Sequence, residues 1–482
     1  MEKMEKKPTT WITPLQKQCW VSVGVALNMG QLGLIFGISS TLLPQLREPD
    51  STITIDEEYG SWIAALPGIT LILGNFTVPI LMAKFGRKRA NLSSIIVLGL
   101  AWCCLVFASN VAMLLAARSL HGIGMGMIST LGPVLVGEYT TPANRGVFLM
   151  FLSVSIAVGV LTVHAMGSYL NWKTVSIICI CIGIIDSIIV LSSPESPSWL
   201  ASQGRYDECK RTFRWLRGDT EEEELDKLIN SNVLARQKDE DCSNKDTFVM
   251  KLKKDIVYIT DTIKRREFYM PIVIMFHVYG LSQWSAVNIF CSYGVDLIHM
   301  VIGKDVDVPL ILISLDFQRS VSTAVGLIIV KKVKRKTLMN LSVGLNLLAM
   351  TVTAGYVFLR NRDFLPYDSS YIGVALMHIH MFSIATGAMP LGFILAGELF
   401  PLQFKSLAGG ISAVCLSLTV FVSIKTVPFF LNNLQLYGTF MLYVGLEIIC
   451  LMMANVLLPE TKDRTLQDIE NEFKNKCVRP TT

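Results

Sequence analysis

The chain has 482 residues, of which 51% are hydrophobic and only 17% are charged, and its mean hydropathy is +0.48. Soluble globular proteins carry about 25% charged residues, so this composition excludes an ordinary soluble fold. The formal net charge of +5 is small for this length, and it gives no reason to expect a nucleic-acid partner.

Long apolar segments divide the chain into candidate membrane spans. A helix of about 20 apolar residues crosses roughly 30 Å of hydrocarbon, and the chain has about twelve such segments. They lie near residues 19–44, 60–82, 91–109, 112–136, 147–169, 173–193, 269–298, 307–330, 337–359, 370–397, 406–430 and 436–458. The pattern predicts an all-α membrane protein.

One long polar segment, residues 194–267, separates the sixth span from the seventh, so the chain divides into six spans plus six. Within it, "GRYDECKRTFRWLRG" and "TEEEELDKLIN" are typical of short amphipathic helices. We therefore expect four parts: an N-terminal six-helix bundle at 1–193, a linker with short helices at 194–267, a C-terminal six-helix bundle at 268–458 and a tail at 459–482.

Lysine and arginine gather in the loops on one side of these spans. They include "KFGRKR" at 84–89, the polar segment and "KKVKRK" at 331–336, whereas the loops on the other side hold few cations. Cations close to span ends keep a loop in the cytoplasm. We therefore expect a multi-pass protein of the plasma membrane with both termini in the cytoplasm.

Three motifs recur in register in the two halves. "AKFGRKRA" follows the second span and "KKVKRKTL" the eighth; "GEYTTPANRG" follows the fourth and "GELFPLQFKS" the tenth; "SSPESPSWL" follows the sixth and "LLPETKDRTL" the twelfth. Many transporters consist of two related halves and place their substrate at the interface between them. The repeat therefore favours a transporter.

These motifs resemble those of the sugar porters of the major facilitator superfamily, and the resemblance covers nearly the whole chain. It rests on "PETKDRTLQDIENEF" at 459–473 and "PESPSWL" at 194–200, together with "RSLHGIGMG", "GEYTTPANRG" and "GELFP". Within that family, "EEYGSWIAALPG" and "GSYLNWKTV" are most similar to the insect facilitated trehalose transporters. The resemblance implies a major facilitator fold and transport of a sugar.

Charged residues at the span ends form a candidate gate. Glu138 and Glu398 end the fourth and tenth spans, and a cation follows each of them seven residues later. A carboxylate among cations on adjacent helix ends can tie the helices together until transport separates them. The resemblance implies a gate role for Arg87, Arg118, Glu138, Arg145, Glu195 and Glu398, and the matching positions in the second half add Arg335 and Lys405. Topological anchoring by solvated surface charges is the simpler alternative.

The gate departs from the family pattern. Ala83 and Lys331 stand where the family has an Asp, and Lys334 replaces a Gly. We expect repulsion among the cations at 331–335 to be relieved only by Glu398, lipid phosphates or counterions.

Neutral amides in the seventh span are candidate sugar ligands, because a carboxamide both donates to and accepts from hydroxyl groups. "LSQWSAVNIFCSY" resembles the family's Gln-Gln-x-Ser-Gly-x-Asn segment. The candidate substrate residues are Gln283, Asn288, Ser282, Arg319, Phe393 and Ser153. Other sugar-contacting positions of the family are changed, with Phe393 in place of Trp, and Leu416 and Ser417 in place of Asn and Trp. We therefore expect weak glucose binding.

Arg319 has two interpretations. It can pair with Asp316, which precedes it by three residues on the same helix face. Alternatively, it can reach the central cavity and select an acidic or otherwise polar solute.

The sequence favours transport without an energy source. Ser39 and Ser40 follow "FG" where the family's proton-coupled members have an Asp, and we expect no carboxylate in the membrane core of the first six spans. No ATP-binding loop, metal-ligand pattern or catalytic cluster is visible, so we expect no cofactor and no enzyme activity. The leading hypothesis is a monomeric facilitative carrier of trehalose or a hexose; a non-transporting sugar sensor on the same fold is the alternative.

Overall fold

The computed structural model describes residues 13–218, 221–243, 261–303, 306–365, 369–401, 405–462, 464 and 466–475. All regular elements in these residues are helices, and none is a β-strand. Twelve helices in this described part of the chain are long and apolar enough to cross a membrane. The predicted all-α membrane protein with twelve spans is thus confirmed.

The first six spans are single helices: α1 (Pro14–Arg47), α2 (Glu57–Phe85), α3 (Arg87–Val106), α4 (Val111–Tyr139), α5 (Pro142–Tyr169) and α6 (Trp172–Ser192). Polar side chains determine several of their starts. Asp56, Asn110 and Asn171 each accept a hydrogen bond from a free backbone N–H in the first turn of the following helix.

The second six spans are less regular. The seventh consists of α11 (Arg266–Gln283) and α12 (Val287–Val301), and the tenth of α15 (Ser370–Ser383), a short π-helix η1 (Ile384–Ala388) and α16 (Met389–Glu398). Three others are single helices: α13 (Val308–Lys332), α14 (Arg335–Asn361) and α17 (Lys405–Lys425). The last, α18 (Val427–Leu457), is kinked at Gln435, whose φ is 56°.

The break in the seventh span differs from the continuous span predicted at 269–298. Helix α11 ends at Gln283, and Ala286 adopts a left-handed conformation with φ of 62° before α12 begins. Only glycine adopts this conformation without cost, so neighbouring contacts must hold Ala286 in it. The break lies beside the predicted sugar ligands.

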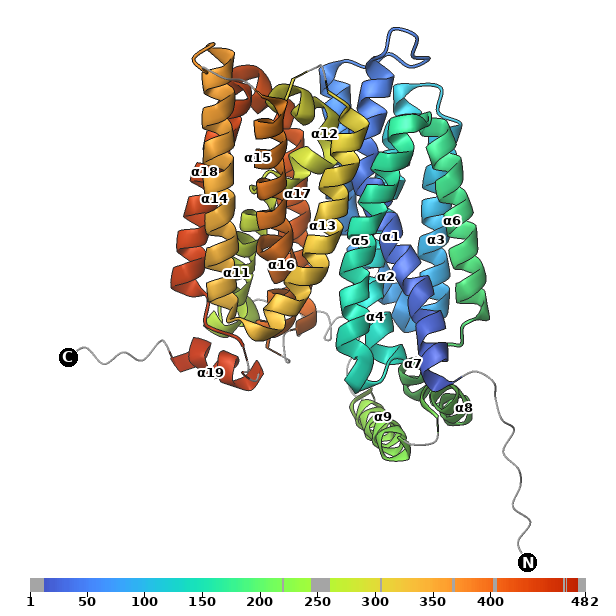
Figure 1. Ribbon diagram of the computed structural model, residues 1–482. Coiled ribbons are helices and arrows are strands. Elements are labelled where there is room, and N and C mark those ends of the chain that lie inside the picture. The colour runs from blue at the N-terminus through green and yellow to red at the C-terminus, as the bar shows by residue number, and fades with distance from the viewer. Residues whose placement is uncertain are drawn as a thin grey trace, which may run out of the picture.

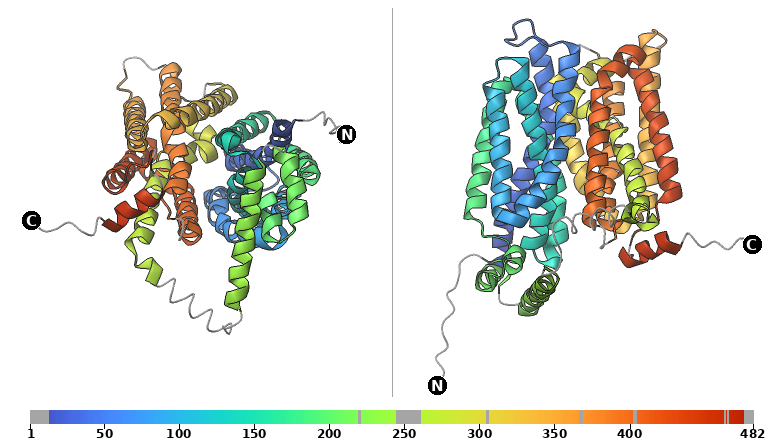
Figure 2. Two further views of the ribbon diagram at one scale, coloured as in Figure 1. Left: turned by 90° about the horizontal axis from the view of Figure 1, so that it is seen from below. Right: turned by 180° about the vertical axis from the view of Figure 1, so that it is seen from behind.

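The twelve spans form two groups that lie side by side, α1–α6 in one and α11–α18 in the other (Figure 1, Figure 2). Within a group, glycines let helices approach closely. A Cβ added to Gly126 of α4 would lie 2.1 Å from the Leu71 carbonyl oxygen of α2, and one added to Gly33 of α1 would lie 2.1 Å from the Ile156 carbonyl oxygen of α5.

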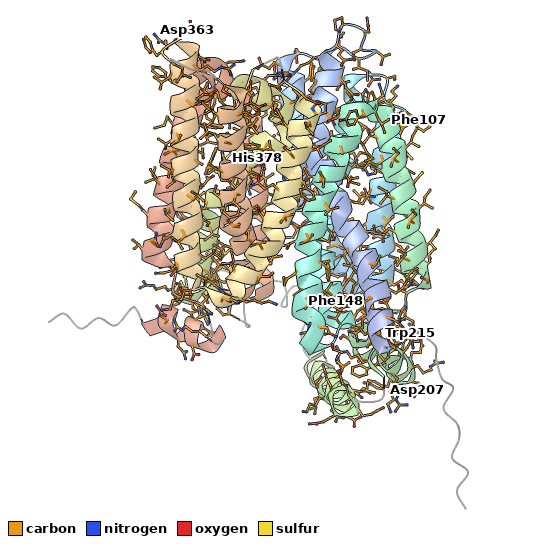
Figure 3. The ribbon with its side chains drawn as sticks, viewed as in Figure 1. Phe107, Phe148, Asp207, Trp215, Asp363 and His378 are labelled. Atoms are coloured by element: carbon orange, nitrogen blue, oxygen red, sulfur yellow. The ribbon has the colours of Figure 1, made fainter. Side chains whose placement is uncertain are left out.

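Four further helices gather at one end of the spans, here called the linker end (Figure 1). They are α7 (Pro197–Ser202), α8 (Tyr206–Arg217), α9 (Glu222–Ser243) and α19 (Leu466–Asn475). Figure 3 shows Asp207 and Trp215 of α8 at this end and Asp363 at the opposite end. Helices α7, α8 and α9 lie within the segment where we expect a linker, of which residues 219–220 and 244–260 lie outside the described residues.

Helix α8 is attached to the first group of spans. Gln18 of α1 donates to the Leu216 carbonyl oxygen at 3.1 Å, and Arg217 donates to the Thr140 carbonyl oxygen at 3.0 Å. Phe213 and Cys209 pack with Trp199 of α7 in a small apolar core. Burial raises the pKa of the Cys209 thiol, so this cysteine is a packing residue.

Candidate functional site

A charged cluster joins α3, α4 and α7 at the linker end. Arg87, the first residue of α3, lies with its Nη2 2.8 Å from Glu138 Oε1 and its Nε 2.9 Å from Glu138 Oε2. This paired contact is the geometry that a guanidinium makes with a carboxylate. Ser196, the N-cap of α7, donates its hydroxyl to Glu138 Oε2 at 2.5 Å.

The second half repeats this cluster. Arg335, the first residue of α14, lies with its Nη2 2.7 Å from Glu398 Oε1, and Thr461 donates its hydroxyl to Glu398 Oε2 at 2.5 Å. Each cluster ties helix ends within its own half. The sequence repeat is therefore a repeat of contacts as well.

A second carboxylate completes each cluster by capping a helix. Glu195 Oε1 accepts the backbone N–H groups of Arg87 and Lys88 at the start of α3, at 2.9 and 3.1 Å. Glu460 likewise accepts those of Arg335 and Lys336 at the start of α14, at 2.9 and 3.2 Å. The first-turn N–H groups of a helix have no partner inside it, and a carboxylate there also complements the helix dipole.

These contacts lower the pKa of Glu460. Partial burial raises the pKa of this carboxyl group, but backbone hydrogen bonds from Arg335, Lys462 and Lys336 outweigh burial, and the net shift is downward. Glu460 also corrects an expectation from the sequence. Glu398 is not the only carboxylate that offsets the cations at 331–335, because Glu460 contacts the same helix start.

Not every predicted gate residue joins a cluster. Arg118 lies twenty residues before Glu138 on α4, about 30 Å away along the helix, and donates to the carbonyl oxygens of Ile63 and Ile35 and to the Ser39 hydroxyl. Arg145 Nε is buried without a hydrogen-bond partner. The Lys405 side chain lies outside the described residues.

The predicted sugar ligands of the seventh span lie together at its break. Asn288 Nδ2 donates to Gln283 Oε1 and to Ser423 Oγ of α17, both at 2.6 Å. Gln283, Asn288 and Ser282 are all buried. The two amides therefore contact each other at the break, and Asn288 also contacts the Ser423 hydroxyl. These hydrogen bonds leave Asn288 Oδ1 and Gln283 Nε2 available to a ligand.

Two further predicted substrate residues are more exposed than these amides. Phe393 of α16 is 58% exposed, and Ser153 of α5 is partly exposed. Ser417, at a changed family position, is buried and donates its hydroxyl to the Ala413 carbonyl oxygen of its own helix at 2.8 Å.

Arg319 belongs to a buried charged group between the halves. Its Nη1 lies 3.0 Å from Cys291 Sγ and its Nε lies 3.9 Å from Asp316 Oδ1, so the predicted pair with Asp316 exists as a charge contact without a hydrogen bond. The closer partner of Asp316 is His164 of α5, whose Nδ1 lies 2.5 Å from Asp316 Oδ2. This contact links α5 of the first half to α13 of the second.

The two halves also meet at the end opposite the linker helices. Arg47 of α1 pairs with Asp296 of α12 at 2.9 Å. Lys425 of α17 donates to Ser61 of α2 at 2.6 Å and lies 4.3 Å from the centre of the Trp62 ring. These contacts close the molecule at the opposite end.

One expectation from the sequence is wrong. Asp186 lies in α6, a span of the first half, and is fully buried, although we expected no carboxylate there. Within the part of the chain that the structure describes, no three His, Cys, Asp or Glu side chains lie close enough together to hold a metal ion.

Sequence reasoning also missed Ser196, Glu460, Thr461 and His164. The first three stand in "PES" and "PET", so the repeat that identified Glu195 contained the signal for them. No spacing in the sequence relates His164 to Asp316, because 152 residues separate them.

A comparison with known families bears directly on these observations. Residues 31–473 match the model of the family described as sugar (and other) transporter. The chain belongs to this sugar transporter family. Curated relatives include the facilitated trehalose transporter Tret1 of Apis mellifera ligustica, which is 24% identical over 97% of this chain and 90% of the relative. The Tret1 of Bombyx mori is also 24% identical, over 98% of this chain and 90% of the relative. The Tret1 of Aedes aegypti is 22% identical, and the chain spans 57% of the length of that relative.

Solved structures of sugar porters have the same fold as this chain. The proton:xylose symporter XylE bound to 6-bromo-6-deoxy-D-glucose matches with a TM-score of 0.72, at 17% identity over 96% of this chain and 100% of that one. Inward-open XylE from E. coli also matches with a TM-score of 0.72, at 17% identity over 94% and 99%. The chain therefore has the major facilitator fold, as the resemblance implied.

Proposed function

We propose that the chain is a facilitative carrier of trehalose or a hexose that works by alternating access, without proton coupling. Family membership supports sugar as the substrate class, and the relatives named as facilitated trehalose transporters favour trehalose. We further propose that the carrier acts as a monomer in the plasma membrane with the linker end in the cytoplasm.

The observation that carries this proposal is the break in the seventh span, in a molecule whose two halves repeat the same contacts. Unwound helix segments at the interface of related halves are where transporters hold small solutes. Here the break holds the Gln283 and Asn288 amides, both able to bond sugar hydroxyls. With the opposite end closed by the Arg47 to Asp296 contact, the path to these amides would open at the linker end.

The absence of proton coupling rests on Ser39. Its hydroxyl accepts from Arg118 Nη2 at 2.9 Å, at the position where proton-coupled members of the family have an Asp. A serine there neither binds nor releases a proton near neutral pH. Among the described residues, Asp316, Asp186 and Glu447 are the buried carboxylates that a coupling mechanism would have to use instead.

Radiolabelled uptake in oocytes tests the function. We expect saturable uptake of trehalose, glucose or both that stops at the outside concentration and does not change with a protonophore. Asn288→Ala should weaken uptake, whereas Asn340→Ala, an exposed amide of α14 paired with Asn455, should not. Uptake above the outside concentration that a protonophore abolishes would contradict uniport.

A sensor that does not transport is the second candidate. It is favoured by the changed family positions, among them Ser417, whose hydroxyl is satisfied by its own helix. Sugar binding to the purified protein without any uptake would support it. A carrier of an acidic or other polar solute would instead require Arg319, so loss of selectivity in Arg319→Asn would favour that reading.

A further inference from the structure

The carboxylate of Asp186 is unusual within the described part of the molecule. The residue is fully buried in α6, and neither of its oxygens has a hydrogen-bond partner. An ionisable group placed in a membrane span at such cost is expected to have a purpose. Asp186 belongs neither to the helix-end clusters nor to the pair of amides at the break of the seventh span.

The second half shows how the same fold satisfies a buried carboxylate. Glu447 of α18, the last span, is also fully buried, but Asn346 Nδ2 of α14 donates to both of its oxygens at 2.9 and 3.0 Å. The first half supplies no such donor to Asp186. It supplies a cavity instead.

A cavity of about 120 Å³ lies between α1, α3 and α6, and Asp186 lines it together with Asn28, Gln31 and Trp102. Most of the remaining lining is apolar, and two of its isoleucines, Ile96 at 62% and Ile184 at 55%, are exposed on the outer surface of α3 and α6. These two helices lie at the side of the first half away from the second (Figure 1). The cavity therefore opens toward the hydrocarbon of the membrane.

Polar groups at the cavity offer more free acceptors than free donors. Asn28 Oδ1, like both Asp186 oxygens, is buried without a partner. Most of the donors are already used: Asn28 Nδ2 bonds Asn91 at 2.6 Å and Ser94 at 3.2 Å, Trp102 Nε1 bonds Gln31 at 3.0 Å, and Gln31 Nε2 uses one of its two hydrogens on the Cys179 carbonyl oxygen at 3.2 Å. A ligand that donates hydrogen bonds fits these free acceptors, and a positive charge suits both the carboxylate and the Trp102 ring.

We propose that this cavity, lined by Asp186, Asn28 and Trp102, binds the protonated amine of an amphipathic molecule that enters from the bilayer. The ammonium group meets the free oxygens of Asp186 and Asn28, and a hydrocarbon body lies against the isoleucines and passes out between α3 and α6. A small inorganic cation fits less well, because the opening faces lipid and the walls are apolar. The site is separate from the proposed sugar path, so its test measures binding and not transport.

Thermal unfolding of the full chain in lipid nanodiscs, titrated with octylamine, tests the proposal. We expect a saturable rise in the unfolding midpoint with octylamine and none with octan-1-ol, which has the same chain length but no charge. Asp186→Asn should weaken the apparent affinity about tenfold or more. Glu447→Gln, the matched buried carboxylate that already has a partner, should leave the affinity unchanged.

A second variant blocks the opening without changing the charge. A Cβ on Gly99, which lies beside the opening, meets no atom within 4 Å, so Gly99→Leu should fold and obstruct entry. Gly344→Leu, at a similarly open glycine of α14, is its control. Equal octylamine affinity in Asp186→Asn and the native chain would overturn the proposal, as would an equal effect of octan-1-ol or of sodium chloride alone, or no effect of octylamine. If Asp186→Asn does not fold, unchanged binding in Gly99→Leu would overturn it.

Discussion

Asn288 is the residue on which sugar affinity should depend most directly. Both hydrogens of its Nδ2 are used by Gln283 and Ser423, so its Oδ1 is the atom it can offer to a hydroxyl group. A hydrogen bond of this kind contributes about 0.5–1.5 kcal/mol net. Because Ser417 and Phe393 supply no replacement for the lost family contacts, we expect native glucose affinity to be millimolar or weaker.

Removal of either amide should therefore be measurable. We expect Asn288→Ala and Gln283→Ala each to raise the KM for the transported sugar by about two- to twelvefold, the equivalent of one hydrogen bond. Competition against a labelled tracer, with Asn340→Ala as control, measures the effect. An unchanged KM in both variants would show that the amides at the break do not bind the transported sugar.

Glu398 offers a test of the gate. Glu398→Gln keeps the shape of the side chain but removes the charge that Arg335 contacts at 2.7 Å. We expect slower substrate exchange with normal surface expression, because the helix ends are less well ordered for closing while the fold remains. Glu208→Gln, which removes a pair exposed on α8, should exchange at the native rate. If Glu398→Gln exchanged substrate at the native rate, the charges at the helix ends would act only as topological anchors.

At the scale of elements, the starts of α3 and α14 are held by carboxylates far away in sequence. Glu460 binds the N-terminus of α14 only as a carboxylate, and its pKa in the folded protein is lowered. A group with a lowered pKa stabilises the fold above its unfolded value of about 4.3. This contribution is lost as the pH falls through the lower, folded pKa.

We therefore expect the midpoint of thermal unfolding to fall on acidification below about pH 4.3, and to fall less steeply in Glu460→Gln. Glu472→Gln, at an ion pair on α19, is a suitable comparison. Identical pH profiles for the native chain and Glu460→Gln would show that the cap does not contribute to stability.

Ala286 tests the break of the seventh span. Its φ of 62° suits glycine, so Ala286→Gly should maintain or raise thermal stability, whereas the β-branched Ala286→Val should lower it by about 1–2 kcal/mol or more. Chemical or thermal unfolding in detergent measures the order. Should Val be tolerated as well as Gly, the break is not held in the left-handed conformation.

The elements differ in how far the sequence predicts them. Apolar length alone locates the twelve spans, because the bilayer fixes how long a span must be. The break at residues 284–286 contains no glycine or proline, so no local signal distinguishes it from a continuous helix. The helix-end clusters were partly predictable because they repeat in sequence, whereas the His164 to Asp316 contact depends on how the two halves pack.

At the scale of the whole molecule, the two ends differ. The clusters at the linker end join helices within one half, whereas contacts at the opposite end join the halves. Exposed ion pairs such as Arg47 with Asp296 contribute only about 0–1 kcal/mol, and so can separate readily. The buried His164 to Asp316 contact would have to break, or move, whenever the halves separate at the opposite end.

The central claim is that sugar crosses the protein only if this opposite end opens. Arg47→Cys with Asp296→Cys allows a reversible bifunctional thiol reagent to link the halves, since the long Arg47 side chain lies between the two backbones and places them too far apart for a direct disulfide. The decisive measurement is exchange of labelled trehalose and glucose in proteoliposomes before linking, after linking and after reduction, with each single variant as control. We predict that linking stops exchange and reduction restores it. Exchange that continues at the same rate in the linked protein would contradict the account.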